Sequence, residues 1–201
     1  MTVRFSCFWD HIKKPSKGFE PFGGLSPAMQ DNETMPQKRI PLEVSRMYHI
    51  WTHANGDENL FREHRNYTYF LEKYSYHVEP VAETYAYCLM PNHLHLMVRV
   101  KNEKEVLEFL RAKKSNPTLQ GFQTLGGFSN AISRQFSHLF NGYTQAYNKL
   151  YKRKGSLFIP NYNRKLISSE NYFRTLIAYI HNNPVHHGFV EKPGQWSYCS
   201  W

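Results

Sequence analysis

Residues 85–100 have the sequence YAYCLMPNHLHLMVRV, in which a proline-asparagine dipeptide separates two stretches of strand-forming residues. This pattern predicts a β-hairpin with strands over Tyr85–Met90 and His93–Val100. Successive side chains of a strand point to opposite faces, so His93 and His95 lie on one side of the sheet. Because the flanking residues are apolar, the second strand is expected to be buried and to present two imidazoles at one place.

Two imidazoles at this spacing can hold a divalent metal ion. For a His-x-His pair on its own, the better interpretation is two ordinary polar residues on the outer face of a sheet. A second segment, Tyr179-Ile180-His181-Asn182-Asn183-Pro184, changes that balance. It closes a helix that we expect to run from Glu170 to Asn183. Pro184 ends this helix, since the residue before a proline is disfavoured in helical geometry.

Apolar periodicity predicts the other elements. A strand and a helix are expected at Arg46–Thr52 and Leu60–Tyr74, further helices at Glu103–Lys114 and Phe128–Leu150, a loop over 113–127, and short extended pieces at Leu157–Ile159 and Lys165–Ile167. This order is close to the split βαβ plan. The predicted fold class is therefore α+β, a ferredoxin-like antiparallel sheet backed by helices.

The chain of 201 residues has one internal boundary. Residues 1–44 are rich in proline and glycine and weakly periodic, so we expect an irregular N-terminal extension. Residues 45–201 are regular in pattern and form one folded domain.

Charge and composition favour a nucleic-acid partner. The chain has 25 lysines and arginines against 16 acidic residues, a formal charge of +9, and 14 tyrosines and 14 phenylalanines. Such a balance favours a polyanion, and aromatic rings can stack on unpaired bases. No apolar run is long enough to span a bilayer, so no membrane association is expected. Three scattered cysteines form neither a disulfide framework nor a zinc motif, which makes a cytoplasmic location the default expectation.

Tyr179 and Asn183 are one helical turn apart, which brings their Cβ atoms to about 5–6 Å. Such a pair is normally found at the edge of a core. Beside a His-x-His metal site it has a chemical use, because Asn183 offers a carbonyl oxygen as a third ligand and Tyr179 a phenolic nucleophile. A phenol, with a pKa of about 10, attacks usefully only an electrophile that a metal polarises. A phosphodiester is such an electrophile, and a phosphotyrosine conserves the bond energy for rejoining.

The segments LMPNHLHLMV (89–98) and YIHNNPVHHG (179–188) resemble those of the IS200-like tyrosine transposases, in particular the REP-associated branch of these HUH nucleases. The similarity extends over roughly residues 47–201. It implies a Y1 transposase-like catalytic domain over 45–201 that cleaves and rejoins single-stranded DNA, often at hairpins, with Mg²⁺ or Mn²⁺ and a 5′-phosphotyrosine. By position, His93 and His95 correspond to the metal-binding pair, Tyr179 to the nucleophile and Asn183 to the third ligand. Members of the family act as a monomer or a homodimer.

Basic side chains are candidates for phosphate contacts or, equally, for a solvated surface. They are Arg134, Lys149, Lys152, Arg153, Lys154, Arg164 and Lys165. Three further tyrosines are rival nucleophiles, although packing of the long helix explains them better: Tyr143, Tyr147 and Tyr151. Three histidines flank the proposed site, and one of them could assist proton transfer: His181, His186 and His187.

Two other functions stay open at this point. One is a hairpin-DNA-binding module that has lost catalysis, which predicts salt-sensitive binding without cleavage. The other is a small zinc hydrolase built on His93 and His95, which predicts tightly bound zinc and indifference to Tyr179.

Overall fold

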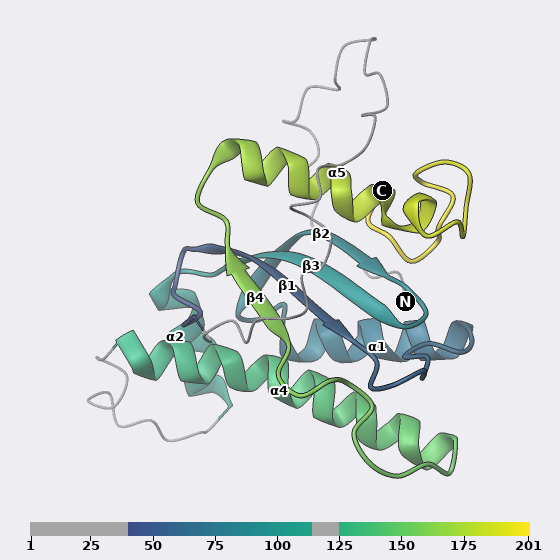
Figure 1. The fold of residues 1–201 in the computed structure, drawn as a ribbon. Coiled ribbons are helices and arrows are strands. Elements are labelled where there is room, and N and C mark those ends of the chain that lie inside the picture. Colours follow the sequence, from purple (N-terminus) through teal and green to yellow (C-terminus); the bar gives the residue numbers. More distant parts are fainter. Residues whose placement is uncertain (1–39, 114–124) are drawn as a thin grey trace. The chain divides into compact units, whose positions relative to one another are not determined.

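The computed structural model of the chain describes residues 40–113 and 125–201. In chain order its elements are β1 (Met47–His53), α1 (His64–His77), β2 (Ala82–Leu89), β3 (His93–Val100), α2 (Glu103–Ala112), α4 (Leu125–Leu150), β4 (Asn163–Leu166) and α5 (Glu170–His186) (Figure 1). The irregular extension expected over 1–44 falls mostly outside the described residues, as does most of the loop expected over 113–127.

The four strands form one antiparallel sheet in the order β2-β3-β1-β4. With α1 between β1 and β2, and α4 between β3 and β4, this is the ferredoxin-like arrangement, and the predicted fold class is confirmed. The hairpin of β2 and β3 is also confirmed, with Leu89 paired to Leu94 next to the turn.

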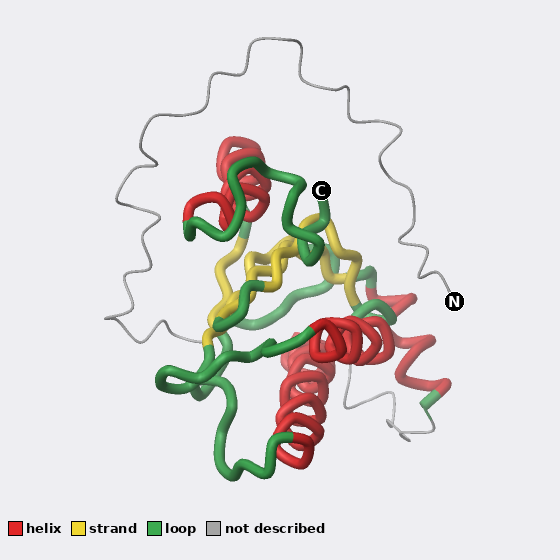
Figure 2. Tube along the Cα trace, turned by 90° about the vertical axis from the view of Figure 1, so that its right-hand side faces the viewer, coloured by secondary structure: helices red, strands yellow, loops and turns green. Residues whose placement is uncertain are grey.

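Helices cover both faces of the sheet, which explains why β3 is buried along almost its whole length. The side chains of Leu94, Leu96 and Val98 belong to the larger core, which also contains residues of α1 and α4. Met97 points the other way, into a smaller core shared with α5. Figure 2 shows the strands between these two helical layers.

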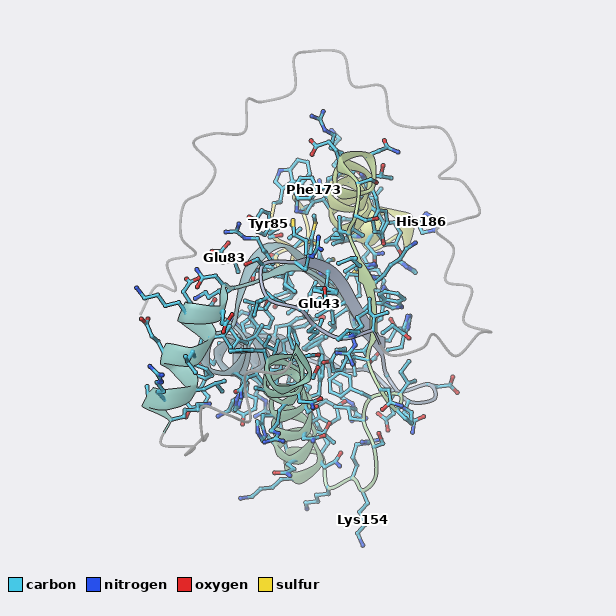
Figure 3. All side chains as sticks on the ribbon, turned by 90° about the vertical axis from the view of Figure 1, so that its left-hand side faces the viewer. Glu43, Glu83, Tyr85, Lys154, Phe173 and His186 are labelled. Atoms are coloured by element: carbon cyan, nitrogen blue, oxygen red, sulfur yellow. The ribbon has the colours of Figure 1, made fainter. Side chains whose placement is uncertain are left out.

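The smaller core fixes α5 on β2 and β3. It contains the buried side chains of Ala86, Cys88, Met90, Met97, Leu176 and Ile180. Near the start of the helix, Phe173 meets the ring of Tyr85 edge-on at 6.1 Å between centroids (Figure 3). Ser169 caps the helix by accepting a hydrogen bond from the Tyr172 amide, as expected of a serine at this point.

The end predicted for α5 was wrong, because Pro184 lies inside the helix, which continues to His186. Proline has no N–H to donate to the carbonyl of Ile180, and the Cys199 thiol donates to that carbonyl at 3.8 Å instead. Three residues further along, the carbonyl of Asn183 accepts from the His187 amide at 3.0 Å. The last turn therefore forms in spite of the proline, and it holds Asn183 in helical geometry.

Two other helix starts differ from the prediction. α1 begins at His64 rather than Leu60, because the amide of Phe61 donates to Pro91 of the hairpin turn and the Asn66 side chain accepts from the amides of Arg62 and Glu63. Helix α4 begins at Leu125, three residues before the predicted start. In the described parts of the chain, none of the helices is long and apolar enough to cross a membrane.

Candidate functional site

Helix α5 positions Tyr179 over the middle of β3. Leu176 and Ile180 fill the smaller core, and the partly exposed ring of Tyr179 lies beside them at the edge of the helix. Its centroid is 5.3 Å from that of the His95 imidazole, with the two rings nearly perpendicular at 82°. Two motifs far apart in sequence are thus in contact within a single chain.

Asn183 lies one turn further along α5 and meets His93. Its Oδ1 is 2.9 Å from His93 Nε2, and the residue is only 1% exposed. The other ring nitrogen, Nδ1, is 2.8 Å from Oδ1 of Asn92. An amide oxygen only accepts and a neutral imidazole has one N–H, so His93 donates either from Nδ1 to Asn92 or from Nε2 to Asn183. In the first of these tautomers Nε2 presents a lone pair to Asn183 Oδ1. Two lone-pair atoms at 2.9 Å repel each other unless a proton or a cation lies between them.

His95 is the second histidine of the pair, with its ring centroid 5.3 Å from that of His93. Its Nδ1 is 3.0 Å from Nε2 of His49, whereas its own Nε2 is buried and has no hydrogen-bond partner within residues 40–113 and 125–201. The Nδ2 of Asn183 is also buried, with no partner in the described parts of the chain. Buried polar atoms of this kind are uncommon in folded proteins, so their grouping here points to a ligand.

Three atoms therefore offer themselves to a cation: His93 Nε2, His95 Nε2 and Asn183 Oδ1. Adjacent ligands of an octahedral ion at 2.0–2.1 Å are about 2.9 Å apart, which equals the separation of the His93 and Asn183 atoms. Among residues 40–113 and 125–201, no group of three or more His, Cys, Asp or Glu side chains is placed to hold a metal ion. The amide of Asn183 is thus needed to complete the donor set, and the residues present fit a divalent cation.

Burial keeps the site's imidazoles uncharged. Desolvation lowers the pKa of His93 to about 4, although the hydrogen bond to Asn183 acts in the opposite direction. Desolvation also lowers the pKa of His49 to about 3 and that of His95 well below its ordinary value. Neutral imidazoles retain the lone pairs that metal ligation requires.

Other aromatic rings surround the paired histidines. His53 stacks on His93 at 5.0 Å between centroids, and His187 approaches the same ring at 4.9 Å. Trp51 stacks on His49 at 4.5 Å. The strand register explains this arrangement, since Trp51 pairs with His95 and His53 with His93 across the sheet.

The other two flanking histidines lie apart from the paired imidazoles. His181 is buried and bonded to the Ser200 hydroxyl at 3.2 Å. His186 is exposed at the end of α5 (Figure 3). Of the three flanking histidines in the sequence, His187 is the one that reaches the ring of His93.

Among the predicted DNA-contact residues, Lys165 lies on the sheet face that carries the histidines. It pairs with His49 in the register of β1 and β4, and directly paired residues project from one face. Its ammonium group lies 4.7 Å from the centre of the Tyr172 ring on α5. Lys165 therefore places a positive charge beside the site.

The other basic candidates lie elsewhere. Arg164 projects to the opposite face, where it donates to Ser133 of α4, and Arg153 is paired with Glu58 at 3.1 Å. The remaining basic candidates are exposed residues of α4 and of the turn after it: Arg134, Lys149, Lys152 and Lys154. Figure 3 shows Lys154 on the far side of the sheet from α5.

The rival tyrosines have structural roles. Tyr143 donates to the carbonyl of Leu60 and Tyr147 to that of Asn59, each at 2.5 Å, so both hydroxyls fix the segment before α1. Tyr151 donates to Glu63. All three belong to the larger core or its margin, on the face of the sheet opposite the histidines.

Three site residues on β1 escaped the sequence analysis: His49, Trp51 and His53. Their alternation in HIWTH, residues 49–53, repeats the spacing of His93 and His95 and was the signal available. It indicates a shared face but not which strand lies alongside.

Comparison with solved structures finds the same fold in a REP-associated tyrosine transposase bound to a REP hairpin. The TM-score is 0.54, the sequence identity is 14%, and the match covers 83% of this chain and 82% of the other. At this identity the likeness establishes the fold, which is the one that the motif resemblance implied. No protein-family model and no curated protein matches the chain.

Proposed function

We propose that this chain cleaves and rejoins single-stranded DNA through a 5′-phosphotyrosine on Tyr179. The observation that carries the proposal is the 5.3 Å approach of the Tyr179 ring to His95, whose neighbour His93 lies 2.9 Å from Asn183 Oδ1. The transposase of similar fold is bound to a REP hairpin, so a DNA hairpin is the first substrate to test.

His93, His95 and Asn183 would hold Mg²⁺ or Mn²⁺. When bound, such an ion polarises the phosphodiester and stabilises the departing oxygen. An amide oxygen and substrate phosphate oxygens favour these ions over zinc, which prefers nitrogen and sulfur ligands. The burial of the two histidines supports this role, because it keeps both rings neutral at neutral pH, each with one unprotonated nitrogen.

Tyr179 would act as the nucleophile. Its oxygen attacks phosphorus, the bond from phosphorus to the 3′ oxygen breaks, and a 3′-hydroxyl is released. The phenolic proton leaves as the new bond forms, and the departing oxygen takes up a proton. One phosphoester replaces another, so attack by a second 3′-hydroxyl reverses the step and joins strands.

We also propose that the site functions within a monomer. Tyr179 and His95 are in contact in one chain, so a second copy is not required to complete the donor set and the nucleophile. The incoming strand would lie over β1 and β4 beside α5, where Lys165 can meet its phosphates and the partly exposed Trp51 ring its bases.

The experiment is to incubate the protein with a single-stranded hairpin oligonucleotide and Mn²⁺ and to look for a protein–DNA species that resists denaturation. We expect the wild type to form it and Tyr179→Phe to lose it while still binding the hairpin. Tyr172→Phe, two turns earlier on the same helix, is the matched control and should retain the adduct. An adduct that persists in Tyr179→Phe would refute the role of this residue.

The same experiment separates the other functions. Hairpin binding without an adduct in the wild type would indicate a binding module that has lost catalysis. Hydrolysis that depends on zinc and tolerates Tyr179→Phe would indicate a hydrolase, although within the described residues no carboxylate, cysteine or third histidine completes a metal cluster.

A further inference from the structure

His49 contacts the nitrogen of His95 that lies on the other side of the ring from Nε2. Its Nε2 is 3.0 Å from Nδ1 of His95, both rings are buried, and the two rings stack at 5.2 Å between centroids. Trp51 covers His49 at 4.5 Å. The imidazole of His49 is therefore held in place by packing, and its bond to His95 has a fixed geometry.

One proton is shared between these two neutral rings, and its position decides what His95 can do. If His49 donates through Nε2, then His95 accepts at Nδ1 and must carry its own proton on Nε2. That proton would be buried without an acceptor, because His95 Nε2 has no partner among the residues that the structure describes. Buried N–H groups without an acceptor are rarer than unfilled lone pairs, so this arrangement is disfavoured.

In the opposite arrangement His95 donates from Nδ1 to His49 Nε2. The Nε2 of His95 then bears a lone pair that a cation can take up. When Asn92 accepts the Nδ1 proton of His93, the Nε2 of that ring is likewise unprotonated. In this arrangement each of the two histidines donates from Nδ1 to an acceptor. Such a hydrogen bond is the usual means of fixing the tautomer of a metal-binding histidine.

We propose that His49 is a positioning residue, which accepts the Nδ1 proton of His95 and so holds His95 Nε2 as a lone pair toward the cation. The inference rests on the proposed function for the identity of the cation site. It assigns a role to a strand that contributes neither the nucleophile nor a ligand.

The first test uses the metal-free wild-type protein and nitrogen-15 NMR of its histidine rings. We expect His95 to carry its proton on Nδ1, with an unprotonated Nε2, at neutral pH. A proton on His95 Nε2 would overturn the proposal. This measurement needs neither a variant nor a substrate.

The second test measures Mn²⁺ binding by calorimetry without DNA. His49→Phe keeps the ring volume but removes the acceptor, so the Mn²⁺ dissociation constant should rise by roughly 10–100-fold. His49→Gln retains an acceptor oxygen and should stay within a few-fold of the wild type. His77→Phe, the same substitution on α1 in the other helical layer, is the control and should bind as the wild type does.

The outcomes separate the two proposals. If the wild type forms the DNA adduct and folded His49→Phe binds Mn²⁺ with unchanged affinity, the role of His49 is refuted and the proposed function is not. A wild type that binds Mn²⁺ with the expected tautomer but forms no adduct refutes the proposed function and leaves His49 in its role. If His49→Phe does not fold, the tautomer of the wild type and the affinity of His49→Gln decide.

Discussion

Substituting Leu176 by alanine tests whether the small core under α5 aligns the nucleophile. Leu176 is 1% exposed and is one of six buried residues in that core. Loss of three carbon atoms costs about 2.4 kcal/mol in transfer free energy, and the space left behind brings the expected total to about 2–5 kcal/mol. Because this core is small, the lost free energy weakens the packing of α5 on the sheet. A shift of about 1 Å in a reacting group can slow a reaction about 100-fold.

The matched control is Leu139→Ala, because Leu139 is equally buried but lies on α4 in the larger core. Urea unfolding should show a similar loss of stability in both variants. The initial rate of adduct formation, measured below both unfolding transitions, should fall at least about tenfold in Leu176→Ala and little in Leu139→Ala. Equal adduct rates in the two variants, with equal losses of stability, would show that the packing of α5 does not position Tyr179.

Two further predictions concern charge. Lys165→Ala should weaken hairpin binding and lower the slope of log affinity against log salt by about 1. Lys154→Ala, on the other side of the sheet, should change the slope less. A salt titration followed by fluorescence anisotropy measures both slopes, and equal slopes would contradict the expected path of the DNA strand. The metal-free protein should lose stability in acid, because the folded pKa values of His49 and His93, about 3 and about 4, lie below the unfolded value of about 6.5. Their contribution is complete above about pH 6.5 and falls by about 1.4 kcal/mol per pH unit for each histidine as the pH drops toward the folded values. Urea unfolding in EDTA from pH 7 to 4.5 measures this loss, and a flat profile would indicate that these imidazoles are solvated.

The fold could be predicted where a local sequence pattern and the tertiary structure agree. Alternating apolar residues around His93 and His95 predicted a buried strand, and that strand is central in the sheet with both faces covered. The spacing of Tyr179 and Asn183 predicted a shared helical face, and both residues reach the histidine pair. These relations hold within single elements, where backbone geometry alone sets the direction of each side chain.

The remaining features depend on contacts between segments. That His49 bonds to His95 follows from the register of β1 and β3, which no local pattern specifies. Where α5 continues past Pro184, the carbonyl of Ile180 accepts from a thiol fifteen residues downstream of the proline, a contact that no local pattern specifies. Similarly, Lys154 and Lys165 looked equivalent in sequence, but the turn between them places them on different sides of the sheet.

Crystals of the protein soaked in Mn²⁺ test the central claim most directly. An anomalous-difference map should contain a peak within coordination distance of His93 Nε2, His95 Nε2 and Asn183 Oδ1, with the hydroxyl of Tyr179 facing the same ion. A peak bound elsewhere, or a peak at the histidines with Tyr179 turned away from it, would contradict the account.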